Sequence, residues 1–304
     1  MNSQAKKGIW QFADLLPPIE DQYKLTLGEG STRVTEIDNI YFKHEYENPT
    51  GSIKDRGLAY QISYVYSQRI KSAVISSSGN AAISAANFCR LAGIELTVFV
   101  SPKIQPSKLA QLAKLGVRIS QSPRPVSEAF KLAKEKNIYN LRPSKDPHGD
   151  IGYSTISYEL HEEPGKRIDA IFFPVSSGTT LTGVAKGFEK LGYLPKLCAV
   201  QTTSVHPIAS IFDKDFVKSN TSLADALVAK YTPRLDEVIS FIKKSGGGGY
   251  IISDEEIIKA NEYLVKNNIN CSFEGAVALA GLWIAQSKGL KFNSPVCLLT
   301  GKLY

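Results

Sequence analysis

The sequence predicts an α/β protein built from two doubly wound parallel-sheet units. From residue 72 onward, short apolar runs of strand length alternate with helix-length segments, and the alternation restarts near residue 170. Such alternation is typical of parallel sheets with helices on both faces. A polar stretch with two prolines, residues 141–150, lies between the two runs. We therefore expect one α/β unit on either side of this stretch.

The first run predicts alternating strands and helices. In chain order these are strand 73–75, helix 81–91, strand 95–100, helix 106–115, strand 117–120 and helix 127–136. Ser127 is the expected N-cap of the last helix, because a serine hydroxyl accepts a hydrogen bond from a free amide of the first turn.

The second run predicts strand 170–173, helix 180–191 and strand 197–201. Further on, Gly246–Gly249 are expected to link a helix that ends at Lys243 and Lys244 to a strand at 250–252. Ser253 and Glu256 fit a capping box at the start of the next helix, in which each side chain accepts a hydrogen bond from the other residue's backbone N–H.

The composition is that of an ordinary globular protein. Of 304 residues, 43% are hydrophobic and 21% are charged, which suits two domains with cores of their own. No apolar run approaches the roughly 18 residues that span a bilayer, and the first residues lack the apolar centre of a signal peptide. We therefore expect a cytoplasmic protein with no membrane partner. The positive charges behind the net charge of +7 are dispersed and no nucleic-acid motif accompanies them, so no nucleic-acid partner is expected.

Cysteine and histidine spacing predicts no metal site. The four cysteines contain no C-x-x-C pair, and the four histidines lack partners at metal-ligand spacing. We expect the cysteines to be reduced and buried.

Two loops are the expected binding elements, because ligands of doubly wound folds bind beyond the carboxyl ends of strands. Ser76-Ser77-Ser78-Gly79-Asn80 follows the first strand, and Ser176-Ser177-Gly178-Thr179-Thr180 follows the later one. Each runs into a helix, whose free amides favour an anion. The second loop predicts a phosphate cradle, although it matches neither the P-loop nor the dinucleotide fingerprint. Helix capping or a tight structural turn remains the alternative for both.

Lys54 is the third element. It follows Asn48-Pro49-Thr50-Gly51-Ser52-Ile53, where a turn leads into a helix. Alone it would be interpreted as a solvated lysine. Together with Asn80 and the phosphate cradle, however, it supplies what a Schiff-base cofactor with a phosphate tail requires, and pyridoxal phosphate is that cofactor.

The segment Asn48-Pro49-Thr50-Gly51-Ser52-Ile53-Lys54-Asp55-Arg56-Gly57 closely resembles the N-P-T-G-S-F-K-D-R-G lysine motif of threonine synthases. These are pyridoxal phosphate enzymes of fold type II, the tryptophan-synthase-β-like superfamily. Further similarities follow in the family's order over nearly the whole chain: Leu27-Gly28-Glu29-Gly30, Ser78-Gly79-Asn80, Gly152 with Thr155, Ser176–Thr180, residues 274–281 and Leu299-Thr300-Gly301. The resemblance implies a large cofactor-binding domain of residues 1–50 and 145–304. A smaller α/β domain, 51–144, would carry the lysine and the Ser-Gly-Asn loop, with the cofactor in the cleft between the two.

The resemblance also implies roles for individual residues. Lys54 corresponds to the lysine that forms the Schiff base and then acts as the general base. Asn80 would hydrogen-bond the cofactor's 3-hydroxyl, and Thr300 would face the pyridine nitrogen. The expected phosphate ligands are Ser176, Ser177, Gly178, Thr179 and Thr180. The expected substrate contacts are Ser77, Ser78, Gly79 and Thr155.

Three departures from the family pattern concern the substrate. Ala81 replaces a threonine, and the stretch from Gly149 to Ser154 lacks the family's arginine, glutamate and lysine. In the family, the threonine and the arginine help to hold the phosphate of O-phosphohomoserine; Arg142, Lys145 or His148 are possible replacements here. Arg33 stands where the family has proline.

The first expectation for function is therefore a lyase of amino-acid biosynthesis, a threonine synthase acting on O-phosphohomoserine and water, with an amino acid as its partner. The resemblance also implies a homodimer. A serine or threonine dehydratase, or a cysteine-synthase-like β-replacement enzyme, is the alternative. A non-catalytic homologue that binds pyridoxal phosphate and a nucleotide-binding Rossmann protein are rivals from other classes.

Overall fold

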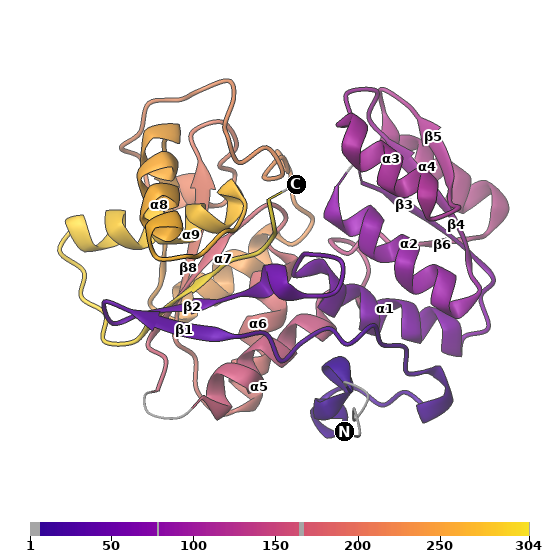
Figure 1. The fold of residues 1–304 in the computed structure, drawn as a ribbon, viewed down its shortest axis with the longest axis horizontal. Coiled ribbons are helices and arrows are strands. Elements are labelled where there is room, and N and C mark those ends of the chain that lie inside the picture. The colour runs from indigo at the N-terminus through magenta and orange to yellow at the C-terminus, as the bar shows by residue number, and fades with distance from the viewer. Residues whose placement is uncertain (1–6, 78, 164–166, 304) are drawn as a thin grey trace. The chain divides into compact units, whose positions relative to one another are not determined.

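The computed structural model describes residues 7–77, 79–163 and 167–303 of the chain (Figure 1). The chain divides into two compact units. The first unit combines Met1–Ser31 with Asn48–Gly152, and the second combines Thr32–Glu47 with Tyr153–Tyr304. These divisions differ from the boundaries near residues 50 and 145 that we expected for functional domains, and that functional division stays a prediction.

The first unit contains a four-stranded parallel sheet in the order β5-β4-β3-β6. Its strands are β3 (Ser72–Ser76), β4 (Glu95–Val100), β5 (Arg118–Gln121) and β6 (Tyr139–Asn140). Its helices are α1 (Lys54–Ser67), α2 (Asn80–Ala92), α3 (Pro106–Lys114) and α4 (Pro125–Lys136), preceded by the short 3₁₀ helices η1 (Gly8–Leu15) and η2 (Asp21–Tyr23). All six elements that we expected in this run are confirmed.

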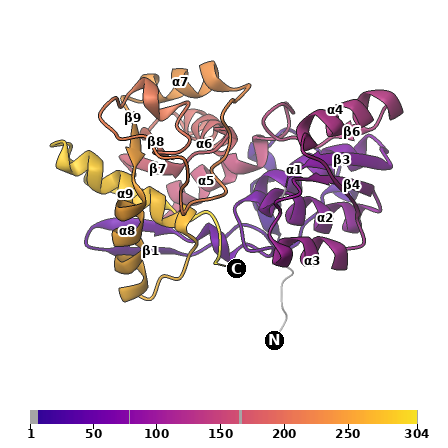
Figure 2. The same cartoon turned by 90° about the horizontal axis from the view of Figure 1, so that it is seen from above.

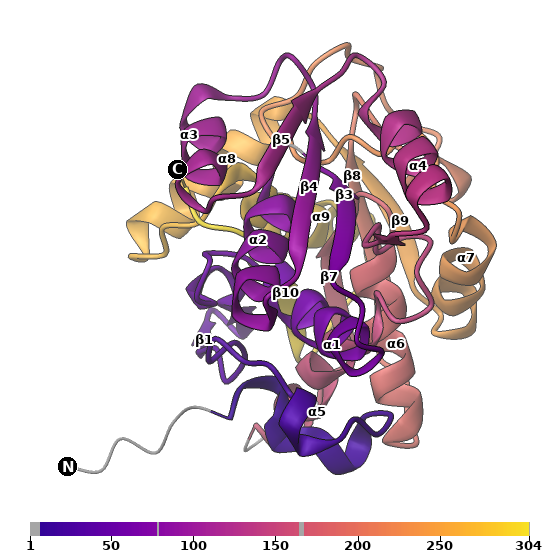
Figure 3. The same ribbon diagram turned by 90° about the vertical axis from the view of Figure 1, so that its right-hand side faces the viewer.

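The helices of this unit lie on both faces of its sheet. The chain moves from β3 through β4 to β5 and then crosses back to β6. Because parallel crossovers are right-handed, the return helix α4 lies on the opposite face from α2 and α3 (Figure 3). Phe99 and Val74 from the sheet pack against Ala129 of α4 in one apolar cluster. Helix α1 packs against α2.

The expected N-cap of α4 is wrong. The helix begins two residues before Ser127, with Arg124 as the N-cap and Pro125 in the first turn. Proline is favoured there because its fixed φ suits the helix and its missing N–H is not needed.

The second unit contains a six-stranded sheet in the order β1-β2-β10-β7-β8-β9. Its strands are β1 (Val34–Ile37), β2 (Ile40–Lys43), β7 (Ala170–Pro174), β8 (Lys196–Thr202), β9 (Gly248–Ile252) and β10 (Pro295–Leu298). Only β1 and β2 pair antiparallel; the other neighbours are parallel. Its helices are α5 (Ser154–Glu162), α6 (Thr179–Lys190), α7 (Leu235–Lys244), α8 (Asp254–Lys266) and α9 (Phe273–Ser287), with short 3₁₀ turns η3 (Glu45–Glu47) and η5 (Ala209–Ile211). A further turn, η4 (Ile151–Tyr153), spans the division between the units.

This unit is doubly wound as expected. Helices α6 and α7 connect the strands from β7 to β9, and α8 and α9 then lead back to β10 on the other face (Figure 2). Helix α9 is buried along most of its length, and its alanines and leucines belong to a core shared with β7, β8 and β10.

The sequence predicts a capping box and a glycine linker near β9. The capping box of Ser253 and Glu256 is confirmed. The expected glycine linker is partly wrong, because Gly248 and Gly249 are the first residues of β9 and pair with Cys198 and Ala199 of β8.

All four cysteines are free and buried. Within the described ranges, no group of three or more acidic, histidine or cysteine side chains could hold a metal ion. In the same part of the chain, no helix has both the length and the apolar character needed to cross a bilayer.

Candidate active site

Lys54 is the first residue of α1 and follows a tight turn. Gly51 has a φ of +86°, which glycine adopts without strain, and its N–H donates to the carbonyl oxygen of Asn48 at 2.7 Å. The Lys54 N–H donates to the Ser52 hydroxyl at 3.4 Å. The turn therefore determines where α1 begins and where the Lys54 side chain is placed.

Two further contacts of the first unit hold this turn. The Asp55 carboxylate accepts hydrogen bonds from the backbone N–H of Thr50 at 2.7 Å and from its hydroxyl at 2.5 Å. The side-chain oxygen of Asn48 accepts one from the N–H of Gly30 at 2.9 Å. A carboxylate in the first helical turn is also favoured by the helix dipole. The side chains of Thr50, Asn48 and Asp55 therefore help to position Lys54.

Burial increases the neutral fraction of the Lys54 amine. It lowers the pKa of this group from 10.5 to about 8, because the charged form loses hydration. The fraction of neutral amine near pH 7 is correspondingly larger. The neutral amine is the form that attacks an aldehyde such as that of pyridoxal phosphate.

The loop after β3 leads into α2 of the same unit. The Ser77 hydroxyl accepts a hydrogen bond from the Gly79 N–H at 3.3 Å. At Gly79, no other atom lies within 4 Å of the position a Cβ would take. Asn80 begins α2, and its buried side-chain oxygen has no hydrogen-bond partner among the described residues. Ser78 lies outside the described residues. This loop offers open space and an unsatisfied amide group.

The second unit presents the expected phosphate loop between β7 and α6. Gly178 is the N-cap of α6 with a φ of +84°, and the Ser177 and Thr179 hydroxyls lie 3.0 Å apart. The first turn of α6 contains no acidic residue. The free amides of this turn and the neighbouring hydroxyls suit an anion, and no carboxylate of the turn competes for them.

Thr300 follows β10 and is held by its neighbours in the second unit. The N–H of Leu299 donates to Lys43 O at 3.0 Å, and the carbonyl of Leu299 accepts from the N–H of Tyr46 at 3.1 Å. The carbonyl of Gly301 accepts from the N–H of Ser272 at 2.8 Å. Thr300 is thus a half-buried hydroxyl residue between two residues that are fixed by backbone hydrogen bonds.

The phosphate loop and Thr300 belong to the same edge of one sheet. β10 and β7 are adjacent and parallel, so their carboxyl ends lie side by side. Thr300 lies two residues after β10, and Ser176 lies two residues after β7. This is the edge at which doubly wound folds bind ligands.

A family model described as pyridoxal-phosphate dependent enzyme matches residues 25–301. The chain belongs to this family. Pyridoxal phosphate is accordingly its cofactor, and the fold type II architecture follows from the two parallel sheets.

Among curated relatives, this pyridoxal-phosphate dependent enzyme is 28% identical to a threonine synthase of Methanocaldococcus jannaschii, over 97% of this chain and 80% of the relative. It is 27% identical to a threonine synthase of Halalkalibacterium halodurans, over 98% of this chain and 89% of the relative.

Solved structures share the fold. A maize serine racemase superposes with a TM-score of 0.77 at 20% identity, covering 89% of this chain and 88% of that one. The processed form of a threonine deaminase from Solanum lycopersicum superposes with a TM-score of 0.73 at 21% identity, covering 87% and 75%. At these identities the likeness establishes the architecture alone.

The residues present fit the family's cofactor. The unpaired side-chain oxygen of Asn80 requires a hydrogen-bond donor, which a ligand hydroxyl can supply. Gly178 is sterically required, because a Cβ there would clash with Cγ2 of Val238. The expected roles of Lys54, Asn80, the loop and Thr300 stay predictions, as do the substrate contacts of Ser77, Ser78, Gly79 and Thr155; Thr155 is buried in α5.

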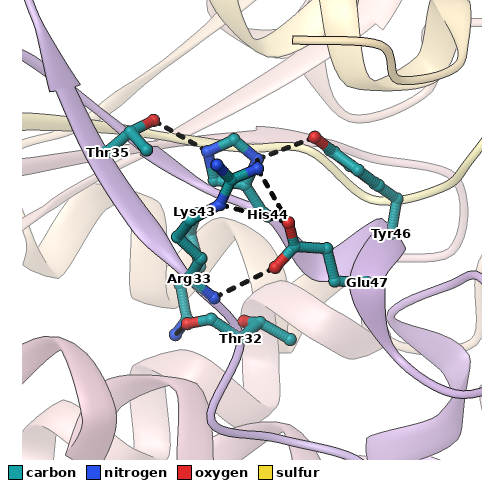
Figure 4. Close-up of polar contacts among 7 residues, drawn as sticks. All are labelled: Thr32, Arg33, Thr35, Lys43, His44, Tyr46 and Glu47. Carbon is teal, nitrogen blue, oxygen red and sulfur yellow. Dashed lines mark hydrogen bonds and ion pairs between the residues drawn. The ribbon is translucent and has the colours of Figure 1, made fainter.

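Arg33 is engaged in a polar network of the second unit. Its Nε and one terminal nitrogen lie 3.2 and 2.8 Å from Oε1 of Glu47. Figure 4 shows the guanidinium beside the His44 ring, which also contacts Tyr46 at 2.8 Å and Thr35 at 2.7 Å. Burial, reinforced by the Arg33 charge, lowers the pKa of His44 to about 4, so the imidazole is neutral at pH 7. The arginine that replaces the family's proline already has an acidic partner.

The three other candidate cations belong to the first unit. His148 stacks on Tyr64 at 3.6 Å, and its Nδ1 lies 3.1 Å from Oδ1 of Asp146. Arg142 and Lys145 both lie over the Phe130 ring. These two line a cavity of about 210 Å³.

The structure also assigns roles that sequence reasoning missed. The N–H of Ala229 donates to Ser176 Oγ at 3.3 Å, and the Thr232 hydroxyl donates to Ser177 O at 2.5 Å. Both residues belong to the irregular connection between β8 and α7, where no periodicity or motif announces a contact with the phosphate loop.

Proposed function

We propose that the protein is a threonine synthase, a pyridoxal phosphate-dependent lyase that converts O-phosphohomoserine and water to threonine and phosphate. The observation that carries this proposal is the Lys54 turn. Its sequence matches the threonine synthase motif, and its structure places a partly neutralised amine at the start of α1. The relatives named threonine synthase, each matched over nearly the whole chain, support it.

The chain's residues have distinct tasks in such a reaction. When bound, pyridoxal phosphate supplies an electron sink for charge that develops at the substrate Cα. The Lys54 amine would first hold the cofactor and then accept the α-proton of the substrate. The amides of Thr179 and Thr180 would hold the cofactor phosphate, and Asn80 would orient the ring. Thr300, a neutral hydroxyl residue, would leave the pyridine nitrogen unprotonated, which favours elimination and replacement chemistry over transamination.

The substrate phosphate needs ligands other than those at Ala81, Gly149 and Ser154. Arg142 and Lys145 are the candidates that the structure favours. They follow β6, which pairs with β3, so they belong to the same sheet edge as the Ser77–Asn80 loop. Asn140, in the same cavity, has a buried side-chain nitrogen with no partner in the described part of the chain. A phosphate would satisfy this donor.

A dehydratase or a β-replacement activity is the second candidate function. Ala81 in the first turn of α2 and Ser154 at the start of α5 favour it, because Ala81 lacks the hydroxyl of the family's threonine and Ser154 carries no positive charge for the substrate phosphate. A homodimer and a cytoplasmic location also belong to this proposal, supported by the family resemblance.

The deciding experiment is a parallel assay of the cofactor-loaded protein with O-phosphohomoserine, threonine, serine and O-acetylserine, in which released phosphate, ammonia and acetate are measured. Phosphate and threonine from O-phosphohomoserine support threonine synthase. Ammonia from serine or threonine, or acetate release without turnover of O-phosphohomoserine, would support the second candidate instead.

Variants connect this assay to the residues. Lys54→Ala should abolish turnover and the visible absorbance of the bound cofactor, whereas Lys71→Ala, which changes an exposed lysine of the same unit, should affect neither.

Arg142→Ala with Lys145→Ala should raise the KM for O-phosphohomoserine about tenfold or more, since each charged hydrogen bond contributes about 1.5–3 kcal/mol. Lys131→Ala with Lys134→Ala removes two exposed charges from neighbouring α4 and is the matched control. If the protein takes up cofactor but turns over none of these substrates, it would be a non-catalytic homologue that binds pyridoxal phosphate.

A further inference from the structure

The second unit contains a cavity whose lining includes none of the residues assigned above to the cofactor or the substrate. It has a volume of about 630 Å³ and is lined entirely by residues between Ser204 and Lys230, on the connection that leaves β8 (salmon to orange in Figure 1). This volume is within the usual range for small-molecule sites. β8 is the neighbour of β7, so the cavity opens at the carboxyl end of the strand next to the phosphate loop.

The charge of the lining is mainly positive. Lys218 and Lys230 belong to it, and Asp225 is the acid among the lining residues. Over the described ranges, neither lysine forms an ion pair. Both ammonium groups are exposed and can therefore pair with a bound anion.

The uncharged lining suits an anion with an apolar part. The Thr221 hydroxyl can donate a hydrogen bond to a ligand oxygen. His206 is oriented by a contact of 3.1 Å between its Nδ1 and the carbonyl oxygen of Thr202, which leaves Nε2 for another partner. Leu227 lines the cavity and belongs to the buried core of this unit, and it provides an apolar floor.

The same segment holds the cofactor-phosphate loop. Val228 and Lys230 line the cavity, and between them the N–H of Ala229 donates to Ser176 Oγ at 3.3 Å. Occupancy of the cavity would therefore restrain the residues that support Ser176.

We propose that this cavity is a second anion site, which binds a small phosphate-bearing organic molecule through Lys218, Lys230 and the Thr221 hydroxyl. It is distinct from the Ser176–Thr180 loop and does not depend on which amino acid the enzyme converts. Bound ligand stabilises the connection at 228–230 and, through Ala229, the loop that holds the cofactor.

Calorimetric titration of the cofactor-loaded protein with phenyl phosphate and with inorganic phosphate tests the proposal. Cofactor occupies its own phosphate loop in this form, so binding there does not interfere. We expect phenyl phosphate to bind more tightly than inorganic phosphate because of the apolar floor. Lys218→Gln with Lys230→Gln should weaken binding of phenyl phosphate about tenfold or more, and Lys218→Arg with Lys230→Arg should retain it.

Lys259→Gln with Lys266→Gln is the matched control. It removes the same charge from two exposed lysines of α8 outside the cavity and should leave the Kd unchanged. All variants change exposed residues, so an unaltered melting temperature verifies folding. The proposal is overturned if the wild-type protein binds no phenyl phosphate at millimolar concentration, or if both glutamine pairs bind it equally. Because binding is measured without turnover, neither result depends on the threonine synthase assay.

Discussion

The carboxylate of Asp55 accepts two hydrogen bonds from Thr50, one from the backbone N–H at 2.7 Å and one from the hydroxyl at 2.5 Å. These bonds close the turn that precedes Lys54 and explain why a threonine and an aspartate lie on either side of this lysine. They give the motif a structural purpose apart from chemistry.

Asp55→Ala should destabilise the protein by about 1–3 kcal/mol, because it removes the carboxylate that accepts from the partly buried N–H and hydroxyl of Thr50. Chemical denaturation measures the loss. Asp55→Asn keeps one acceptor oxygen and should lose less, and Asp14→Ala, at an exposed position, is the control. Equal stability of Asp55→Ala and wild type would contradict the role assigned to this pair.

The lowered pKa of Lys54 predicts how cofactor uptake depends on pH. The neutral amine becomes the major form above a pKa of about 8, so the rate of pyridoxal phosphate uptake by the apoprotein should rise from about pH 7 and level off above about pH 9. Visible absorbance follows the reaction, and Nα-acetyl-lysine serves as the reference amine. A rate that keeps climbing towards pH 10.5, as for the reference, would mean that Lys54 is not perturbed.

The same pKa shift makes a prediction about stability. Between about pH 8 and pH 10.5 the unfolded chain binds a proton at Lys54 that the folded chain does not, so the stability of the apoprotein should increase with pH in this window. Subtracting the pH profile of Lys54→Met isolates the contribution. Parallel profiles for the two proteins would argue against a depressed pKa.

Gly178→Ala should weaken cofactor binding and stability together. The residue has a φ of +84°, and the added Cβ would clash with Cγ2 of Val238. Left-handed backbone costs a non-glycine residue about 1–2 kcal/mol, and the clash adds to that cost. Gly192→Ala is the matched control, with a φ of +80° and open space around the new Cβ. If both variants unfold at the same temperature and bind cofactor alike, the close contact with Val238 is unimportant.

The buried ion pair of Lys43 and Glu159 should depend strongly on both partners. Their charged atoms lie 2.6 Å apart, with side-chain exposures of 1% and 8%. Lys43→Met should destabilise the protein by about 3–5 kcal/mol, because it removes the cationic partner of a buried carboxylate, whereas the double variant Lys43→Met with Glu159→Leu should recover most of that loss. Thermal unfolding of the two single variants and the double variant measures the coupling. Additive effects would rule it out.

The sequence predicts the helices and strands that depend on local residue patterns. Helix α2 follows a capping segment and ends before Gly93, whose φ is +64°, and the alternation of elements predicts both parallel sheets. Prediction from local sequence failed where pairing with a neighbouring strand determines the secondary structure. Gly248 and Gly249 resemble a linker, but they extend β9 because Cys198 and Ala199 offer backbone partners.

Some residues of the candidate site are also predictable from the sequence, whereas others are visible only in the structure. Lys54, Asn80 and the Ser176–Thr180 loop can be proposed from sequence because each stands in a recognisable motif at an element boundary. The support that Ala229 gives to Ser176 joins residues 53 positions apart, and no local pattern reports such a contact. The sequence shows that Arg33 stands where the family has proline, and only the structure shows its ion pair with Glu47.

The position of β10 has a consequence for how the protein is made. Its residues, Pro295–Leu298, come after every other strand in the chain, yet they pair with β2 on one side and with β7 on the other. On a ribosome, the sheet of the second unit stays split, with β1 and β2 apart from β7, β8 and β9, until β10 has been made. Unpaired edges of β2 and β7 are then exposed to other nascent chains. Cells that produce this enzyme should therefore form aggregates most readily when translation stalls shortly before residue 295.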